Sequence, residues 1–218
     1  MFYQLLRILV LLPVKLLYRV EFQGAERVPG KGPVVISANH SSYLDWLLIP
    51  LGIPRKVRYM VYYEYFKNPL FRLLMKAYRC FPVYQRGGMD KGAFEAAVKL
   101  LRQGEVVGIF PEGSLSRNGR LQEGKPGAAR IAASVGAPLV PVSIIGAFPI
   151  FPKGRSFPRL SGKIRVIYHP PIPTDPAKRR DKTYLEKLTE QVMHTIQSGL
   201  PEAMGPKESR EREAEGVR

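Results

Sequence analysis

The stretch Val34-Val35-Ile36-Ser37-Ala38-Asn39-His40-Ser41-Ser42-Tyr43-Leu44-Asp45 joins a short apolar run to a cluster of polar residues. The run over 34–38 has the length and the branched side chains of a buried strand. The pattern over 42–51 predicts a helix. A histidine at the end of a strand, with an acidic residue five positions later, can be a general base held by a carboxylate. The same residues can also be no more than a helix cap.

Helical geometry separates these two interpretations. Side chains five positions apart on one regular helix point about 140° apart, too far to touch. His40 and Asp45 can therefore meet only if His40 precedes the helix and Asp45 lies in its first turn, with Ser41 or Ser42 as N-cap. Asp45 would then orient the imidazole and leave one nitrogen free as a base. Alternatively, Ser42-x-x-Asp45 approximates a capping box and His40 is a loop residue, which these letters alone slightly favour.

Apolar runs and helical patterns alternate along the rest of the chain. Strands or extended segments are expected at 57–61, 80–84, 106–110, 139–145 and 163–168, and helices at 69–76, 90–102, 126–135 and 178–198. This alternation predicts an α/β fold, a single-domain αβα sandwich around a largely parallel or mixed sheet. Ligands of such folds bind at the carboxyl ends of strands. We expect this domain over 23–200 and a disordered charged tail over 201–218.

The first residues, 1–22, predict an amphipathic helix. On a helical wheel leucines fill most of one side, and the other, polar side carries Gln4, Arg7, Lys15, Tyr18 and Arg19. The apolar run between Arg7 and Lys15 is far shorter than the ~20 residues of a spanning helix. The pattern is typical of a helix that lies in a membrane interface, although packing on the domain's own core is the alternative. We expect a peripheral or monotopic protein on the cytoplasmic face of the cell membrane.

The charge balance limits the classes of partner. The formal net charge is +16, from 34 Lys and Arg against 18 Asp and Glu, which favours polyanions: nucleic acid, anionic membrane surfaces or phosphorylated ligands. No nucleic-acid-binding motif is visible, so we expect no nucleic acid partner. No His, Cys or Asp grouping has metal-ligand spacing, and we expect neither a metal nor another cofactor. The single cysteine, Cys80, is expected to be a buried inert thiol.

A second polar stretch, Phe110-Pro111-Glu112-Gly113-Ser114-Leu115-Ser116-Arg117, also follows an expected strand. Glu112 could bind the hydroxyls of a polyol and Arg117 could pair with a phosphate. Alone, the stretch is equally consistent with a turn and a solvated glutamate. Two more cations stand beside turns, Arg86 before two glycines and Lys125 before Pro-Gly.

With these motifs in order, the sequence resembles the glycerolipid acyltransferase family over roughly 24–171. Its best-known members are the 1-acylglycerol-3-phosphate acyltransferases. The N-H-x4-D block is matched by Asn39, His40 and Asp45, and the F-P-E-G-T-R-S block by 110–116. Two less specific blocks are matched by 81–86, which ends in Arg86, and by 138–142.

The resemblance implies transfer of a fatty acyl group from acyl-CoA or acyl carrier protein to the hydroxyl of a lysophospholipid, lysophosphatidate, giving phosphatidic acid. His40 would deprotonate the hydroxyl and Asp45 would orient the imidazole. The acceptor would be held by Arg86, Glu112, Gly113, Ser114, Arg117 and Lys125.

One position departs from the family pattern. Leu115 stands where the family has the arginine of its third block, so a cation expected on the acceptor phosphate is absent there. Either Arg117 substitutes from two residues on, or the acceptor is another lysolipid or a lipid-linked sugar. The alternative of a different class is a non-catalytic basic module that binds membranes or nucleic acid. That module explains the charge but not His40, Asp45 and Glu112 near strand ends.

Overall fold

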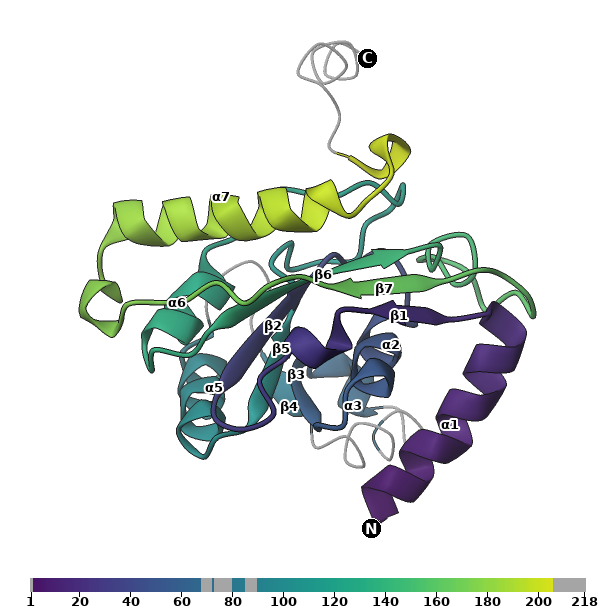
Figure 1. Ribbon diagram of the computed structural model, residues 1–218, viewed down its shortest axis with the longest axis horizontal. Coiled ribbons are helices and arrows are strands. Elements are labelled where there is room, and N and C mark those ends of the chain that lie inside the picture. The colour runs from purple at the N-terminus through teal and green to yellow at the C-terminus, as the bar shows by residue number, and fades with distance from the viewer. Residues whose placement is uncertain (1, 68–71, 73–79, 85–89, 206–218) are drawn as a thin grey trace.

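A computed structural model describes residues 2–67, 72, 80–84 and 90–205 (Figure 1). In chain order its elements are α1 (Phe2–Tyr18), β1 (Glu21–Gln23), η1 (Ala25–Arg27), β2 (Val34–Ala38), α2 (Asp45–Gly52), β3 (Val57–Tyr62), α3 (Glu64–Lys67), β4 (Phe81–Val83), α5 (Lys91–Arg102), β5 (Val106–Ile109), α6 (Gly127–Ala133), β6 (Leu139–Ile145), β7 (Arg165–Tyr168), η2 (Pro176–Lys178), α7 (Lys182–Ser198) and η3 (Glu202–Met204). The helix predicted at 69–76 lies outside the described residues except for Arg72.

The described strands form one sheet in the order β1-β7-β6-β2-β5-β3-β4. Strands β2 to β6 run in one direction, and β7 pairs with β6 in the antiparallel sense. Strand β2 is central, with Ser37 opposite Ile109 of β5 on one side and Pro141 of β6 on the other. The predicted largely parallel α/β fold is confirmed. The two polar stretches therefore begin at the same edge, where β2 and β5 end.

Helices cover both faces of this sheet, because successive strand residues point to opposite sides. Val35 and Val107 pack against α5, α6 and α7, and Ile36 and Val106 pack against the side that carries α2 and α1. Figure 1 shows α7 and α6 on the opposite side of the sheet from α1. The sheet is thus the middle layer of the predicted sandwich.

Helix ends differ from the predictions where side chains supply caps. Helix α7 begins at Lys182, not at 178, because the Asp181 side chain accepts from Tyr184 N and the preceding residues form η2. Helix α5 begins as predicted, with Asp90 accepting from Ala93 N. After α7, near the C-terminal end of the described residues, Met204 O accepts from Leu121 N at 2.8 Å. The first residues of the predicted disordered tail are therefore ordered, and residues 206–218 lie outside the described residues.

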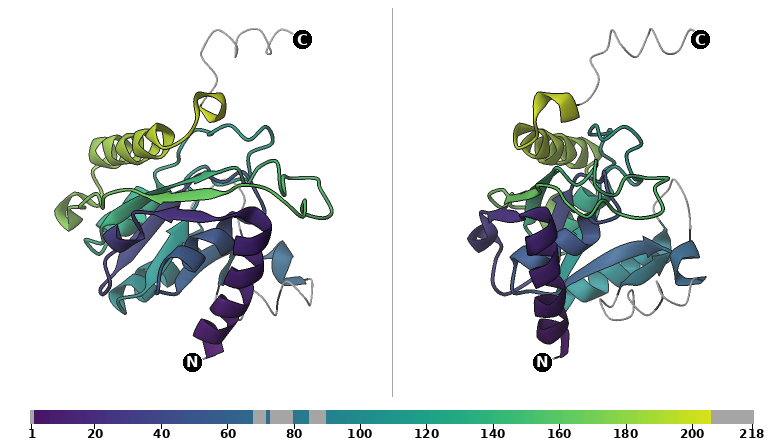
Figure 2. Two further views of the ribbon diagram at one scale, coloured as in Figure 1. Left: turned by 45° about the vertical axis from the view of Figure 1, so that its right-hand side comes forward. Right: turned by 90° about the vertical axis from the view of Figure 1, so that its right-hand side faces the viewer.

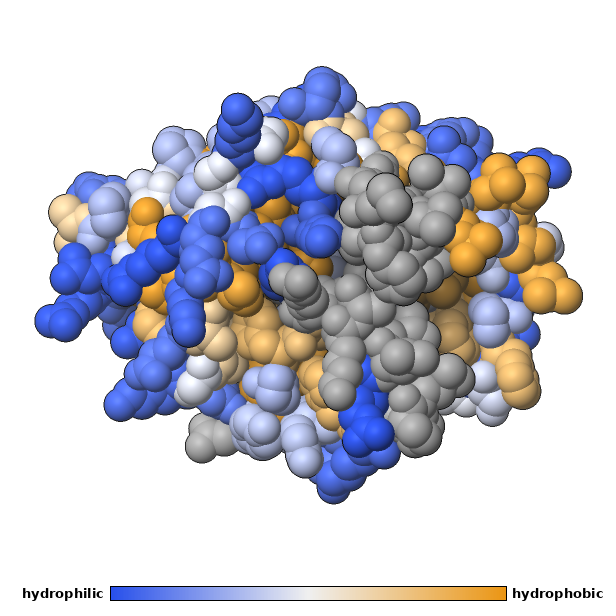
Figure 3. Space-filling view, turned by 90° about the horizontal axis from the view of Figure 1, so that it is seen from below, coloured by the Kyte–Doolittle hydropathy of each residue, from blue (hydrophilic) through white to orange (hydrophobic). Residues whose placement is uncertain are grey.

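Helix α1 runs through Pro13 and directs its apolar side chains to two sides. Val14 and Tyr18 are buried in the core, so the prediction that Tyr18 belongs to the polar side is wrong. Leu9, Leu12 and Leu16 are 68%, 63% and 74% exposed. Viewed from below, hydrophobic side chains gather along the side of the molecule where α1 lies (Figure 3). Within the described part of the chain, no helix is long and apolar enough to cross a membrane.

Candidate active site

The loop after β2 is tied to the neighbouring strand by an amide side chain. Asn39 is buried, and its Nδ2 donates to Ile144 O at 3.0 Å while its Oδ1 accepts from Ile144 N at 2.7 Å. The side chain thus imitates one more residue of strand pairing between β2 and β6. This fixes the backbone immediately before His40.

His40 and Asp45 are in contact. His40 Nδ1 lies 3.0 Å from Asp45 Oδ2, and Asp45 is fully buried. The contact is possible because His40 precedes α2 and Asp45 is the first residue of that helix. His40 Nε2 has no hydrogen-bond partner among the residues that the structure describes, and the side chain is 21% exposed. The pair therefore presents one ring nitrogen to solvent or to a ligand.

The start of α2 corrects the predicted serine cap. Asp45 Oδ2 accepts from the backbone N–H groups of Ser41 and Ser42, both at 2.7 Å. The N-cap position is Leu44, whose side chain makes no cap, and Ser42 Oγ accepts from Leu44 N at 3.2 Å and donates to Phe151 O at 3.1 Å. These bonds hold the residues before Asp45 in a turn, and the helix begins three residues later than predicted. One carboxylate oxygen serves both the cap and the histidine.

An aromatic ring packs against one face of the His40 imidazole. The ring of Phe110 stacks on His40 with centroids 3.9 Å apart and planes 13° apart. On Phe110 a further ring, that of Tyr59, stacks at 5.9 Å. The imidazole is thus constrained through its Nδ1 by Asp45 and across its face by Phe110. A base held this way loses little freedom when a substrate binds.

Glu112 connects the two polar stretches. It is 3% exposed, and its Oε1 accepts from the His40 backbone N–H at 2.6 Å. Its Oε2 accepts from Gln122 N and Gln122 Nε2, both at 3.0 Å. Burial raises the pKa of the Glu112 carboxyl, and these hydrogen bonds oppose the shift. The His40 carbonyl accepts from Ser116 N at 2.7 Å, so both backbone groups of His40 are held by the loop after β5.

An open hollow lies on this same loop. It has a volume of about 340 Å³ and is lined by Ser114, Leu115, Ser116, Arg117, Asn118, Gln122 and Lys153. Of the residues predicted to bind the acceptor, Ser114 and Arg117 line it. Lys125 lies over the turn at Gly113, where a Cβ would come within 3.2 Å of Lys125 Nζ and φ is +70°. Arg86 lies outside the described residues.

The chain is similar to known proteins in sequence and in fold. A family model described as Acyltransferase matches residues 19–145. The chain belongs to this acyltransferase family. The match includes β2, β5 and β6 and thus both polar stretches. The predicted resemblance is therefore confirmed.

Individual relatives of this chain carry more specific names. A 1-acyl-sn-glycerol-3-phosphate acyltransferase of Bacillus subtilis is 31% identical over 81% of this chain and 86% of its own length. A chloroplastic enzyme of the same name from Brassica napus is 33% identical over 71% of this chain, which spans 45% of that relative's length. The crystal structure of the 1-acyl-sn-glycerophosphate acyltransferase from Thermotoga maritima superposes with a TM-score of 0.63 at 24% identity, covering 87% of this chain and 80% of that one. This likeness shows a shared fold.

Two polar residues at the site, Gln122 and Lys153, belong to no motif in the sequence. Gln122 binds Glu112, and Lys153 reaches the hollow from the loop after β6. Neither lies in a motif, and no local spacing points to them.

Among the described residues, no three His, Cys, Asp or Glu side chains are grouped to hold a metal ion. Burial raises the pKa of the Cys80 thiol to about 11, in keeping with the predicted inert cysteine.

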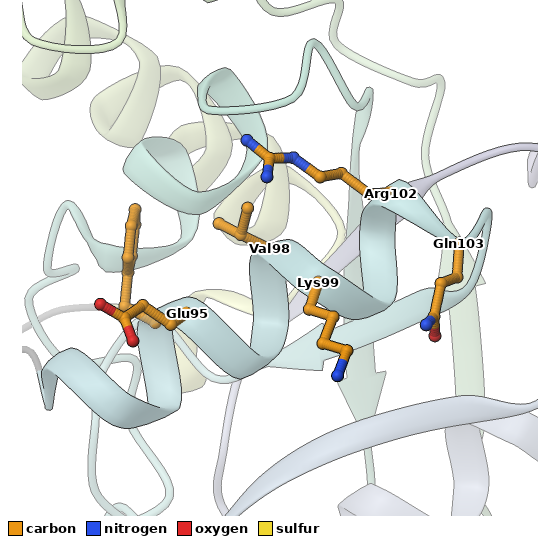
Figure 4. A pocket seen from close by; sticks show the side chains of 6 residues that line it. Glu95, Val98, Lys99, Arg102 and Gln103 are labelled. Atoms are coloured by element: carbon orange, nitrogen blue, oxygen red, sulfur yellow. The ribbon is translucent and has the colours of Figure 1, made fainter.

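A larger hollow of about 600 Å³ follows one side of α5 (Figure 4). It is lined by Phe94, Glu95, Val98, Lys99, Arg102 and Gln103. All six belong to α5 or to its C-cap, and the hollow contains no histidine and no residue of the two polar stretches. We therefore do not assign the active site to this hollow, although it has the greater volume.

Proposed function

We propose that this acyltransferase moves a fatty acyl group from acyl-CoA or acyl carrier protein to the free hydroxyl of lysophosphatidate, giving phosphatidic acid. The observation that carries the proposal is the His40–Asp45 pair at the carboxyl end of β2. In this pair His40 Nε2 has no hydrogen-bond partner among the described residues. The names of relatives such as the Bacillus subtilis enzyme support the choice of acceptor.

In the proposed reaction, His40 Nε2 accepts the proton of the acceptor hydroxyl as its oxygen attacks the thioester carbonyl carbon. Asp45 keeps the Nδ1–H tautomer in place and stabilises the imidazolium that forms. The tetrahedral intermediate then collapses, the carbon–sulfur bond breaks, and the leaving thiolate takes the proton from His40. No covalent acyl-enzyme is required, because the histidine activates the acceptor directly.

Other residues receive proposed roles in holding the acceptor. Arg117, with Lys153 across the same hollow, supplies positive charge for the phosphate. Ser114 lines this hollow, and Lys125 lies over Gly113 next to it. Glu112 has both oxygens engaged by protein N–H groups, so we assign it to positioning His40 and not to direct contact with glycerol. Arg86 is retained as a candidate from its motif alone.

A second acceptor class has one specific observation in its favour. Leu115, which replaces the family arginine, lines the hollow with Ser114 and Arg117. A hollow with less fixed positive charge suits a lysolipid whose phosphate carries a headgroup. The chemistry at His40 would be unchanged. A non-catalytic basic module is a weaker alternative, because it gives no reason for the bonded array around His40.

We also propose peripheral association with the cytoplasmic face of an anionic membrane through α1. Leu9, Leu12 and Leu16 form an exposed apolar side, and Lys15 is exposed next to Leu16. A helix with such a side lies in the headgroup region with its leucines buried among acyl chains. The helix's other side, with Val14 and Tyr18, is already packed on the domain.

The deciding experiment is a thioester-release assay of the purified protein against a panel of lysolipids, with both acyl-CoA and acyl carrier protein as donors. We expect thiol release with lysophosphatidate to exceed that with lysophosphatidylcholine or lysophosphatidylglycerol. His40→Ala is the matched blank. Release that is fastest with a headgroup-bearing lysolipid would overturn the acceptor but keep the chemistry. Absence of release with every acceptor would overturn the activity.

A further inference from the structure

The loop between β6 and β7, residues 146–164, projects two large apolar side chains into solvent. Phe157 is 80% exposed and Leu160 is 76% exposed. Both lie on a loop whose base is closed: Arg159 N donates to Ile150 O at 3.0 Å, and Ile150 is buried in the core. Gly146 approaches Lys163 O so closely that no Cβ would fit. A base held this firmly presents the apolar tip in a defined direction.

The same loop is strongly cationic. Lys153, Arg155, Arg159 and Lys163 lie on it, and the chain has no acidic residue from 124 to 174. Lys163 pairs with Glu21, but the other three form no ion pair with any residue in the described ranges. Apolar side chains between unpaired cations are the pattern that anionic bilayer surfaces attract, because apolar groups enter the interface and cations meet headgroups.

The loop lies beside both α1 and the hollow that Ser114 and Arg117 line. Ile164 N donates to Tyr18 O, the last residue of α1, at 3.1 Å. Phe151 O accepts from Tyr43 N at 3.0 Å, within the His40–Asp45 stretch. Lys153 lines the hollow itself. The right-hand panel of Figure 2 faces the side of the molecule on which both α1 and this loop lie.

We propose that the β6–β7 loop is a second membrane-contacting element that inserts Phe157 and Leu160 into the interface of an anionic bilayer. With α1 it gives the protein two separated points of contact, which set the orientation of the hollow toward the lipid surface. The loop's cations meet lipid phosphates at the rim of the site. The proposal rests on the proposed membrane association through α1 and adds an element that is remote from it in sequence.

The first test measures partitioning of the full-length protein onto vesicles of phosphatidylcholine with phosphatidylglycerol, by sedimentation. We expect Phe157→Ser combined with Leu160→Ser to weaken partitioning by about tenfold or more, since tenfold is only about 1.4 kcal/mol and burying two such side chains stabilises by more than that. Arg155→Gln combined with Arg159→Gln should also weaken it. The matched control, Lys99→Gln with Arg102→Gln on α5, removes the same charge and should bind as the wild type does.

A second test places an environment-sensitive fluorophore on Phe157→Cys or on the control Lys99→Cys. The raised pKa of the Cys80 thiol keeps it protonated near neutral pH, so the introduced cysteine reacts first. We expect a blue shift on anionic vesicles at position 157 and none at 99. Equal spectra at the two positions, or unchanged partitioning of the Phe157 and Leu160 variant, would overturn the proposal.

Failure of this proposal can be told apart from failure of the proposed function. Vesicle binding needs no catalysis, so a protein without acyl-transfer activity can still show the loop's contribution. Unchanged vesicle binding, with a raised KM for acyl carrier protein thioester in the Phe157 and Leu160 variant, would instead identify the loop as a protein-docking surface and overturn the membrane assignment. A wild-type protein that binds no vesicles would overturn both the loop and the α1 proposals.

Discussion

Two histidines follow strands of the same sheet, and their surroundings give them different chemistry. His40 follows β2 and has Nδ1 bound to Asp45 while Nε2 has no described partner. His169 follows β7, with Nε2 at 2.8 Å from Ser143 Oγ, and that hydroxyl donates in turn to Ile196 O at 2.7 Å. His169 Nε2 therefore donates to Ser143 Oγ, which joins β6, β7 and α7, and the partner is a neutral hydroxyl, not a carboxylate that could stabilise an imidazolium.

The position of each strand explains the difference. Strand β7 is antiparallel to β6, so the chain leaves β7 toward the amino end of β6, and His169 lies beside Pro141 within that strand. Burial, and then the positive charge of Arg27, lower the pKa of His169 and favour its neutral form. A histidine at a strand end is therefore a stronger candidate base when a carboxylate holds one ring nitrogen, as Asp45 does for His40, than when a hydroxyl holds it, as Ser143 does for His169.

His40→Ala should lower the rate of acyl transfer about 1,000-fold, within the range that a general base contributes. Thermal unfolding should change little, because the ring is partly exposed. His169→Ala should have the opposite profile, with a lower unfolding temperature and nearly normal activity per folded molecule. Thiol release and calorimetry on both variants check this. Full activity in a folded His40→Ala protein would refute the proposed base.

Asp45→Asn should lower kcat by roughly 100-fold, since the amide no longer fixes the Nδ1–H tautomer or stabilises the imidazolium. A loss of about 1–3 kcal/mol of stability should accompany it, because two backbone N–H groups lose a charged acceptor. Asp181→Asn is the control, as Asp181 also accepts a backbone N–H at a helix start but lies at α7. Equal activities in the two variants would contradict the pairing role.

Glu112→Gln should lower kcat by about tenfold with a small change in KM for the acceptor. The amide places an N–H group against either the His40 N–H or the two Gln122 donors, which shifts His40 or costs a hydrogen bond. The control is Glu123→Gln, because Glu123 is an exposed glutamate on the same loop, directly after Gln122. A rise in KM at constant kcat would instead indicate that Glu112 contacts the acceptor, as the sequence analysis first expected.

Arg117→Gln should raise KM for lysophosphatidate about tenfold and leave kcat within a factor of two, because a charge-assisted hydrogen bond to phosphate contributes roughly 1.5–3 kcal/mol. The control is Arg102→Gln on α5, which removes an equal charge at the other hollow and not at the one that Arg117 lines. Steady-state kinetics at fixed ionic strength separate the two. If KM is unchanged, the phosphate is held elsewhere.

Protonation of His169 should destabilise the fold under mildly acidic conditions. Its folded pKa is lowered below the unfolded value of about 6.5, so the unfolded chain takes up the proton first. Its contribution to the free energy of unfolding is fully present above about pH 6.5 and decreases below it, by at most ~1.4 kcal/mol per pH unit. Denaturant titrations from pH 7.5 to 5.5 should show a shallower decrease for His169→Ala than for the wild type.

Much of the fold follows from local pattern. The strands at 34–38 and 139–145 have the predicted bounds, and the cap at Asp90 lies where the sequence indicates. Short branched runs and capping side chains act within a few residues, so their signals are local. The start of α2 differs from the prediction because the residues before Asp45 form a turn, in which the Asp45 carboxylate accepts from the N–H groups of Ser41 and Ser42.

The α/β class, the family and the two polar stretches that supply the candidate site can be read from local sequence patterns. Three further features depend on tertiary contacts: which nitrogen of His40 is open, which side of α1 is exposed, and the inward direction of the Glu112 side chain. The reason is distance along the chain: Glu112 and the His40 backbone are 72 positions apart and meet because β2 and β5 are neighbours. No local spacing encodes such a contact, and it is this contact that holds His40 in place.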